Sequence, residues 1–233
     1  MHPGRQFEFL RRVQILAGLS PVSLEELAKT CRWHTYKRGE EILGYGDPSS
    51  DVFFLVSGRV RAIIHTACGK AVILRDLRTG DIFGEIAAID RSPRSASVEA
   101  LEAATVAALT VSQFENLLLK EPRVALATLR HIAGEQRRLS QRVLEFSTLV
   151  VQNRIQAELL RLAADADGEG AQPLLSPAPL LSDIANRVST HREAVSREMS
   201  RLTSIGLLRR EGRNLRVIDI GRLEKLVHDI KGE

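Results

Sequence analysis

Short apolar runs separated by glycine-containing turns fill the first half of this 233-residue chain. The turns recur at intervals of about ten residues, a spacing typical of an antiparallel barrel or sandwich. They fall at Gly39, Gly46-Asp47-Pro48, Gly58, Gly69 and Gly80-Asp81. The apolar runs predict strands over residues 52–56, 60–64, 71–74 and 104–109.

Two capping-box patterns predict helices on either side of these strands. Ser23-Leu24-Glu25-Glu26 precedes the first strand, and Ser112-Gln113-Phe114-Glu115 follows the last. In such a box the hydroxyl and the carboxylate each bond a free backbone amide at the helix start. The second helix is expected to break near Pro122, because proline interrupts the helical hydrogen-bond ladder.

A longer helix is predicted from about Arg123 to Phe146, with a length of about 35 Å at the rise of an α-helix. One seam along it has 3-4-3-4-3 spacing and consists of Leu129, Ile132, Gln136, Leu139, Val143 and Phe146. Such a seam is typical of a helix that packs on a second copy of itself, and Gln136 could set the register. A single amphipathic helix lying on its own β-domain has the same pattern, and three heptads do not separate the two interpretations.

Past this helix, the pattern predicts another helix, a loop and a change of domain. Residues 149–164 continue as a helix, which the acidic and glycine-rich stretch 165–170 ends. Prolines indicate a loop over residues 172–179. We expect the hinge between two domains near Phe146-Ser147-Thr148.

Two short helices and a hairpin follow the loop. The helices, residues 181–188 and 191–202, are separated by a turn at Ser189, and the second has polar residues on its open face. This arrangement is a helix-turn-helix pattern. Residues 205–208 and 213–218 read as a two-stranded wing that turns at Gly212. The apolar residues expected to face inward are Ile184, Ala185, Val188, Val195, Met199 and Leu202.

Charge supports a polyanionic partner for this last region. The formal net charge is only +4, but residues 192–216 contain seven arginines against Glu193, Glu198 and Glu211. Clustered cations suit nucleic acid, although a charge run can also be a solvated face. The arginines are Arg192, Arg197, Arg201, Arg209, Arg210, Arg213 and Arg216.

Several classes of protein are disfavoured by composition. No apolar run approaches a membrane span, and Met1 to Leu10 carries charges without the apolar core of a signal peptide. We therefore expect a cytoplasmic protein without a membrane partner. Cys31 and Cys68 are too few for an iron–sulfur cluster, and we expect idle thiols rather than a disulfide. We expect no bound metal and no enzymatic activity, because no nucleophile–base pair, metal-ligand cluster or nucleotide-hydrolysing motif is evident.

One motif carries the chemistry of a sugar-phosphate ligand. Gly84-Glu85-Ile86-Ala87-Ala88 is followed by Arg94-Ser95-Ala96. A carboxylate can accept from a ribose hydroxyl, and a guanidinium can pair with a phosphate through two hydrogen bonds. Glycine lets the backbone approach closely. A simple surface ion pair between Glu85 and Arg94 is the alternative.

These features resemble the CRP/FNR superfamily of bacterial regulators. The motifs that carry the resemblance are GDPSSDVFFLVSGRV (46–60), GDIFGEIAAIDRSPRSASVEA (80–100) and the helix Thr190-His191-Arg192-Glu193-Ala194-Val195-Ser196-Arg197. They are most similar to the cyclic-AMP-receptor members. The resemblance extends over nearly the whole chain.

The resemblance implies an α+β protein of two domains. Residues 1–147 would form a double-stranded β-helix, the jelly-roll-like cyclic-nucleotide-binding β-roll, together with a long dimerisation helix. Residues 148–233 would form a C-terminal winged helix-turn-helix. The expected function is a cyclic-nucleotide-responsive transcription regulator, a homodimer that binds a pseudo-palindromic duplex DNA and meets RNA polymerase.

The resemblance also implies a ligand site. Its residues would be Gly84, Glu85, Ile86, Ala87, Arg94, Ser95, Leu139 and Ser140. Glu85 would take the ribose 2′-hydroxyl, while Arg94 and Ser95 would take the cyclic phosphate of cAMP. Leu139-Ser140 stands where the cyclic-AMP receptors present a Thr-Ser pair to adenine, so one hydroxyl is lost. Ser95 could also serve a guanine amino group, so cGMP stays open, as do cyclic di-GMP and independence of ligand.

The recognition helix would supply the DNA contacts: Thr190, His191, Arg192, Glu193, Ser196 and Arg197. The base-reading positions are Arg192, Glu193 and Arg197, since arginine suits guanine and glutamate suits cytosine. Thr190-x-x-Glu193 is also a capping box, so Glu193 could instead close the helix start. Thr190 and His191 would touch phosphate, which positions the protein without specifying sequence.

Two other interpretations remain open on the sequence. The same fold could sense haem or redox state, with His34 or His131 as ligands. The β-roll could also be a cyclic-nucleotide-binding module that acts on a protein partner, although the arginine-rich region argues against it.

Overall fold

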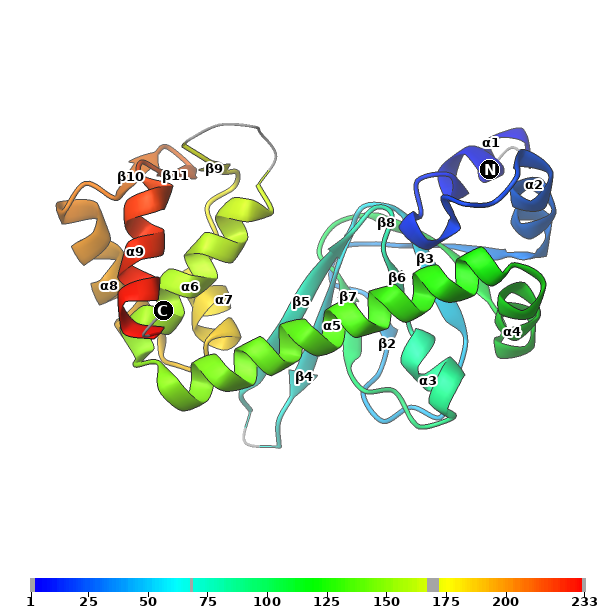
Figure 1. Cartoon of the computed structure of the whole chain (residues 1–233), viewed down its shortest axis with the longest axis horizontal. Helices are drawn as coiled ribbons and strands as arrows, with labels where there is room; N and C mark the ends of the chain where they lie inside the picture. The colour runs from blue at the N-terminus through cyan, green and yellow to red at the C-terminus, as the bar shows by residue number, and fades with distance from the viewer. Residues whose placement is uncertain (1–2, 68, 167–171, 232–233) are drawn as a thin grey trace. The chain divides into compact units, whose positions relative to one another are not determined.

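A computed structural model describes residues 3–67, 69–166 and 172–231, so Cys68 lies outside the described residues. The chain forms two compact units, Met1–Gln136 and Arg137–Glu233 (Figure 1). The boundary lies inside helix α5 (Pro122–Thr148). The domain boundary predicted after residue 147 lies one residue before the end of this helix and stays a prediction.

The first unit is a β-roll of two antiparallel four-stranded sheets, with strand orders β1-β8-β3-β6 and β2-β7-β4-β5. This confirms the predicted fold class of its β-domain, and the four predicted strands are β3, β4, β5 and β8. Helices α1, α2 and α4 flank the roll, and α3 follows β6. The strands are β1 (Arg32–Tyr36), β2 (Glu41–Leu43), β3 (Val52–Ser57), β4 (Arg59–His65), β5 (Ala71–Arg78), β6 (Ile82–Phe83), β7 (Ser97–Ala100) and β8 (Ala104–Leu109). The helices are α1 (Pro3–Leu10), the 3-10 helix η1 (Gln14–Leu16), α2 (Pro21–Thr30), α3 (Glu85–Asp90) and α4 (Val111–Lys120).

Strand β3 is apolar throughout because both of its faces are covered. Phe53 and Leu55 belong to the core cluster between the two sheets. Val52, Phe54 and Val56 belong to the cluster that also includes residues of α2 and α4. Successive side chains of a strand point to opposite faces, so burial on both sides yields a continuous apolar run.

Both helices next to the strands begin earlier than the capping-box patterns predicted. Helix α2 is capped by Ser20, whose side chain accepts from the amide of Ser23, and Pro21 occupies the first turn. Helix α4 is capped by Thr110, which forms a capping box with Gln113. The starts predicted at Ser23 and Ser112 were wrong. The hydroxyls of Ser20 and Thr110 lie just before the first turn, where they accept from free backbone amides, whereas Ser23 and Ser112 lie inside the helices.

The long helix and the break after it agree with the sequence. Helix α5 ends at Thr148, and helix α6 (Val151–Ala164) starts after a two-residue interruption. This interruption directly follows the predicted hinge at residues 146–148.

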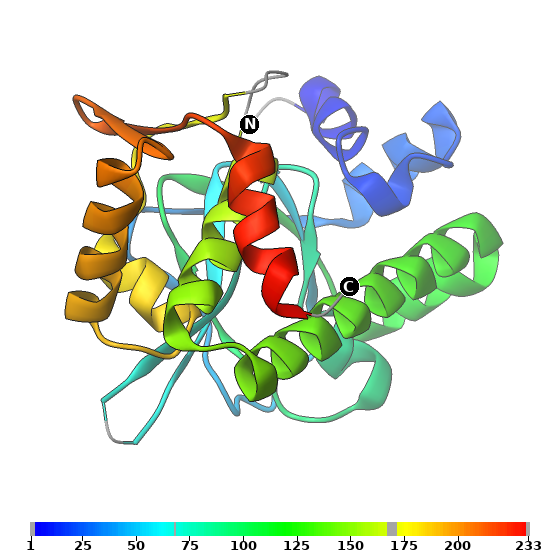
Figure 2. The ribbon, with the colours of Figure 1, turned by 60° about the vertical axis from the view of Figure 1, so that its left-hand side comes forward.

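The second unit is a winged helix-turn-helix. Helix α7 (Leu181–Arg187) and helix α8 (Arg192–Ser204) are joined by a turn in which Ser189 has φ +52°. The wing strands are β10 (Leu208–Glu211) and β11 (Asn214–Val217), and helix α9 (Ile220–Lys231) follows. In Figures 1 and 2, α8 lies at the edge of this unit, and α6 and α9 both lie on the same side of α8. The predicted loop 172–179 contains a short strand, β9 (Leu174–Leu175), which pairs with β11.

The core of this unit is as the sequence predicted. Ile184, Ala185, Val188, Val195 and Leu202 are buried in one cluster, and Met199 packs against it. Apolar spacing at the helical period predicts such an inward face.

Cys31 behaves as a structural thiol. It is a free, buried cysteine, and burial raises the pKa of its thiol to about 12. A group with so little thiolate at neutral pH is a poor nucleophile and a poor metal ligand. No helix within the described ranges is long and apolar enough to cross a membrane.

Candidate functional site

Arg94 is the centre of the predicted ligand site, and its side chain is buried. It lies in the segment between α3 and β7. Its residue is only 3% exposed. The guanidinium donates from Nε to Ser49 Oγ at 3.0 Å, from Nη1 to the carbonyl of Gly84 at 2.9 Å and from Nη2 to the carbonyl of Asp51 at 2.8 Å.

The two sequence motifs of the β-roll meet at Arg94. The backbone amide of Arg94 donates to the carbonyl of Asp47, and the amide of Gly46 donates to the carbonyl of Arg94, both at 2.9 Å. The segment 46–51 therefore positions Arg94 through its main chain as well as through its side chain. Ser49 and Asp51 were not predicted as site residues, although both lie within the motif at residues 46–60.

Gly84 is required at this site for two reasons. It caps α3 with φ +82°, a left-handed conformation that favours glycine. A Cβ atom built there would lie 2.7 Å from Nη1 of Arg94 and 2.8 Å from the carbonyl oxygen of Asp51. The close approach predicted for this glycine is thus an approach to Arg94.

The charge of Arg94 has no anionic partner in contact. All three of its acceptors are uncharged, and no described carboxylate forms an ion pair with it within 4.0 Å. Burial lowers the pKa of Arg94, while Asp51, Asp47 and Glu85 act in the opposite direction from farther away. An arginine has five N–H donors, so three hydrogen bonds leave two donors for a ligand.

Glu85 is buried beside the long helix rather than paired with Arg94 at the surface. It is 6% exposed, and its Oε1 lies 3.6 Å from Nε2 of His131 on α5. The alternative of a surface ion pair between Glu85 and Arg94 was therefore wrong. Ala87 is buried next to it on α3, whereas Ile86 is exposed. Ser95 is exposed and directly follows Arg94.

Leu139 and Ser140 are the remaining predicted ligand residues. Both lie on α5 within the second compact unit, and both side chains are exposed. Their contact with a ligand stays a prediction.

The predicted base-reading residues form one exposed face of α8. Arg192, Glu193, Ser196 and Arg197 are all exposed. Glu193, Ser196, Arg197 and Ser200 line a shallow hollow of about 460 Å³. Thr190 is half-buried and His191 exposed at the helix start.

Glu193 does not close a capping box. Helix α8 begins at Arg192 with His191 as its cap residue, and no side chain bonds the free amides at this start. The alternative role for Glu193 was therefore wrong, and its carboxylate is available on the exposed face.

Only part of the predicted arginine cluster is available to a polyanion. Arg201 donates to Glu198 at 2.7 and 2.9 Å, and Arg216 donates to Glu211 at 2.8 Å through two nitrogens. These hydrogen bonds raise the pKa of both arginines and stabilise their charged form. The exposed arginines without such a pair in the described chain are Arg192, Arg197, Arg209, Arg210 and Arg213.

Both halves of the chain match models of known protein families. Residues 33–121 match the cyclic nucleotide-binding domain, and residues 153–226 match the Crp-like helix-turn-helix domain. A CRP-like cAMP-activated global transcriptional regulator from Mycobacterium tuberculosis is 24% identical over 94% of this chain and 98% of its own length. The cAMP-activated global transcriptional regulator CRP of Salmonella typhimurium is 26% identical over 83% of this chain and 92% of its own. The chain belongs to the CRP/FNR family of transcription regulators.

The fold of this CRP/FNR regulator is shared with solved structures. A CooA mutant from Carboxydothermus hydrogenoformans superposes with a TM-score of 0.76 at 22% identity, covering 92% of this chain and 94% of that one. At this identity the similarity establishes the fold alone, and the residues of the site must decide the ligand.

For the haem or redox interpretation, the described part of this regulator shows no cluster of metal-ligating side chains. No group of three or more His, Cys, Asp or Glu residues that could hold a metal ion occurs among the side chains that the structure describes, in residues 6–67, 69–166 and 172–227. His34 is exposed on β1, and His131 faces Glu85.

The inner face of the recognition helix carries a buried charge that the sequence pattern did not indicate. Glu198 is 2% exposed and accepts a hydrogen bond from Gln156 of α6 at 2.7 Å, in addition to those from Arg201. A buried carboxylate needs such partners, since burying it unpaired is costly. This DNA-binding unit thus holds α8 on α6 through polar as well as apolar contacts.

Proposed function

We propose that this CRP/FNR regulator binds a cyclic nucleotide in its β-roll, most favourably cAMP, and that the nucleotide controls its binding to DNA. The observation that carries the proposal is the buried guanidinium of Arg94, whose acceptors are all uncharged. A buried cation without an anion is unfavourable by several kcal/mol. A cyclic phosphate accepting from its two remaining N–H groups would supply the missing anion.

The other groups of the site have matching roles in this proposal. The hydroxyl of Ser95 lies next to Arg94 in the chain and would take a second phosphate oxygen. Glu85 would accept from the ribose 2′-hydroxyl, and its contact with His131 would then be shared or broken. Gly84, Ile86 and Ala87 would line the sugar, with Gly84 leaving room for Arg94.

The base is recognised by fewer hydroxyls than in the cyclic-AMP receptors. Leu139 cannot hydrogen-bond a base edge, so Ser140 would act alone from α5. Two relatives are named for cAMP, which favours adenine. The loss of one hydroxyl weakens the expected preference for adenine over guanine, so cGMP is the second candidate ligand.

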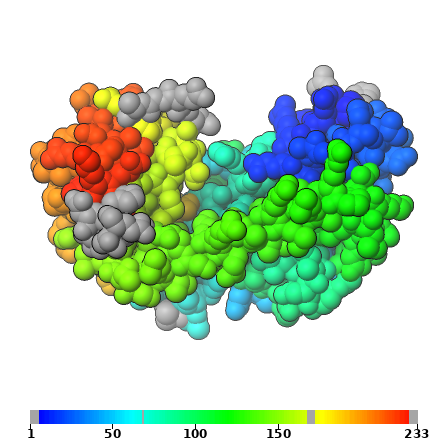
Figure 3. Space-filling model, viewed as in Figure 1, coloured from blue at the N-terminus to red at the C-terminus, as the bar shows by residue number. Residues whose placement is uncertain are grey.

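The proposed active form is a homodimer through α5. The predicted seam contains apolar side chains with large exposed fractions, including Leu129 at 63% and Val143 at 64%. Figure 3 shows α5 as a continuous green band on the surface of the chain. A second copy of the helix would bury this seam, with Gln136 at its centre.

Replacing Leu129 with aspartate should convert the dimer to a monomer. A charge in the seam would be desolvated on association, so we expect the dimer dissociation constant to rise at least about 100-fold. Analytical ultracentrifugation measures it. The matched control is Leu119→Asp, because Leu119 is 81% exposed on α4 and lies outside the seam. A dimer unaffected by Leu129→Asp would contradict the proposed interface.

A dimer of this kind would read a pseudo-palindromic duplex. Two recognition helices would enter successive major grooves about 34 Å apart. Arg192, Glu193 and Arg197 would read guanine and cytosine, while Thr190, His191 and Ser196 would contact the backbone or neighbouring edges. RNA polymerase is the proposed protein partner at the promoter.

The nucleotide can control DNA binding only through different affinities for two states of the protein. Glu85 is linked to α5 through His131, and α5 runs on into the second unit. A ligand that engages Glu85 and Ser140 would therefore favour one arrangement of α5.

The test is calorimetric titration of the full chain with cAMP and with cGMP. We expect saturable binding of cAMP and a cGMP affinity within roughly tenfold of it, since only one base-contacting hydroxyl is available. Anisotropy of a labelled duplex, selected from a random library, should then show tighter binding with the nucleotide present. No heat and no effect of either nucleotide on DNA affinity would refute the proposal.

A further inference from the structure

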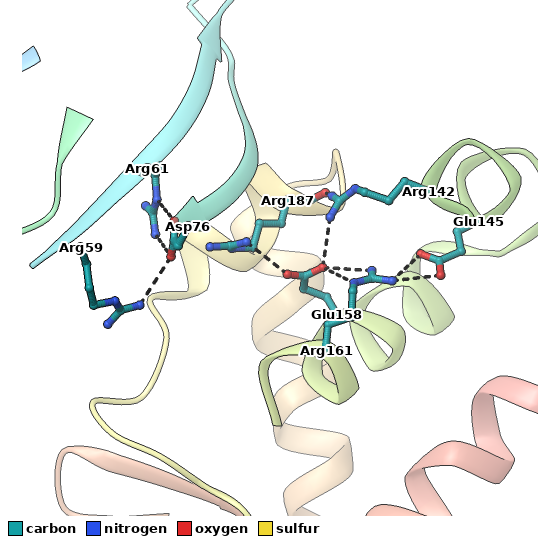
Figure 4. A network of polar contacts seen from close by, with 8 residues as sticks. All are labelled: Arg59, Arg61, Asp76, Arg142, Glu145, Glu158, Arg161 and Arg187. Carbon is teal, nitrogen blue, oxygen red and sulfur yellow. Dashed lines mark hydrogen bonds and ion pairs between the residues drawn. The ribbon is translucent and has the colours of Figure 1, made fainter. Parts of the chain in front are cut away.

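Five charged side chains, four of them buried, form a cluster where α5, α6 and α7 meet in the second unit (Figure 4). Glu158 is 2% exposed, and Arg142, from the end of α5, is 8% exposed. No sequence pattern predicted this cluster, because its residues come from three helices. Its members are Arg142 and Glu145 of α5, Glu158 and Arg161 of α6, and Arg187 of α7.

Glu158 is the centre of this cluster. Its carboxylate lies 3.0 Å from Nη2 of Arg161, 3.4 Å from Nη1 of Arg142 and 3.5 Å from Nη1 of Arg187. Arg161 also donates to both oxygens of Glu145, at 2.9 and 3.0 Å. Burial opposes the charge of Arg161, but Glu158 and Glu145 outweigh it and raise its pKa. Each buried charge therefore depends on the others, and removing one leaves uncompensated charge behind.

Arg142 makes a second contact, with a backbone group. Its Nη2 donates to the backbone carbonyl of Arg187, the last residue of α7. Carbonyl groups at a helix C-terminus lack intrahelical donors and carry partial negative charge, so a guanidinium is a favourable partner. Arg142 also lies over the ring of Phe146 at 5.6 Å, which further restrains its side chain.

The residue that Arg142 holds is directly connected to the recognition helix. Four residues separate Arg187 from Arg192 at the start of α8, and the amide of Thr190 donates to the carbonyl of Ala185 at 3.0 Å within this turn. Gln156 of α6 bonds Glu198 of α8. The turn before α8 and the middle of α8 are therefore both attached to the elements that Arg142 and Glu158 join.

We propose that Arg142 is the positioning residue that holds the recognition helix to the end of α5, through Glu158 and the carbonyl of Arg187. The two-residue interruption between α5 and α6 would otherwise be free to bend. With the cluster intact, any rotation of the last turns of α5 is passed on to α7 and α8. The proposal concerns how α8 is aimed, and Arg142 is not among the residues proposed to contact nucleotide or DNA.

The first measurement is the distance distribution between nitroxides at Ser147→Cys on α5 and Ser200→Cys on α8. Both serines are exposed. The background carries Cys31→Ala and Cys68→Ala, and labelled protein is diluted with unlabelled protein so that only distances within one chain contribute. Double electron–electron resonance should give a narrow distribution for the parent chain and a clearly broader one for Arg142→Met. This measurement uses neither DNA nor nucleotide, so it stands even if the proposed ligand is wrong.

The second measurement is affinity for two duplexes at fixed salt. One is the duplex selected by the parent chain, and the other is an unrelated duplex of equal length. We expect Arg142→Met to lose about tenfold or more on the selected duplex, the range of a hydrogen bond from a charged donor. Affinity for the unrelated duplex depends on exposed arginines, so the affinity of Arg142→Met for this duplex should stay within about twofold of that of the parent chain.

Two further variants complete the test. Arg137→Met removes a charge from an exposed position of the same helix and should leave both readouts unchanged. Arg142→Lys keeps the charge but loses the planar guanidinium that can bond two acceptors at once. It should therefore show the same effects to a smaller degree, and it serves as the test if Arg142→Met does not fold. A narrow distribution in the Arg142 variants, or equal losses on both duplexes, would overturn the proposal.

Discussion

Replacing Arg94 with alanine should lower the affinity for cAMP and cGMP at least about 100-fold, because truncating one partner of a buried charge pair costs several kcal/mol. Arg94 is 3% exposed and makes three hydrogen bonds to uncharged acceptors, so a bound phosphate would supply an anion in direct contact with it. Calorimetric titration measures the loss. The variant should also lose the rise in melting temperature that saturating nucleotide gives the parent chain.

The controls separate ligand binding from folding. Arg91→Ala removes a nearby exposed arginine, which pairs with Glu115 at the surface, and should bind nucleotide normally. Arg94→Lys keeps a cation in the site but loses the paired N–H donors of the guanidinium. Its affinity for nucleotide should therefore fall between those of the parent chain and Arg94→Ala. If Arg94→Ala folds and binds as tightly as the parent chain, the phosphate does not sit on Arg94.

Replacing Arg197 with alanine should weaken binding to the selected duplex roughly 5- to 150-fold, the equivalent of one bidentate arginine–guanine contact. Arg197 is exposed on the face of α8 that also carries Glu193 and Ser196, and no described side chain pairs with it. Selection of duplexes by the variant should show relaxed preference at one position of each half-site. Fluorescence anisotropy at fixed salt measures the affinities.

An arginine of the wing provides the contrast. Arg213 is exposed next to Gly212 at the wing turn, and Arg213→Ala should weaken all duplexes about equally while lowering the salt slope by about one. Equal losses on every duplex for Arg197→Ala as well would assign Arg197 to the backbone instead of a base.

Local sequence patterns were reliable where a single element decides the structure. The apolar spacing of residues 181–202 predicted both helices of the helix-turn-helix and their buried faces, because one helical face meets one core. The same reasoning failed at Ser23 and Ser112. Each lies near a second candidate cap, Ser20 or Thr110, and the backbone conformation of the flanking residues decides between them.

The charged residues of the second unit show a different limit. Seven arginines in one stretch predicted a polyanion-binding surface, yet Arg201 and Arg216 are paired with Glu198 and Glu211. Composition counts charges, whereas pairing depends on which side chains the fold brings within hydrogen-bond distance.

By itself, the sequence determined the two-domain organisation, the β-roll, the long helix and the helix-turn-helix. These features follow from the periodicity of apolar residues, the spacing of glycines and short motifs. All of these patterns involve residues that lie close together in the sequence. Only the tertiary structure decided that Arg94 is buried against Ser49 and Asp51, that Glu85 faces His131, and that Arg142 reaches Glu158 and Arg187. These contacts join segments far apart in the chain, and such contacts arise from packing, which no local period encodes.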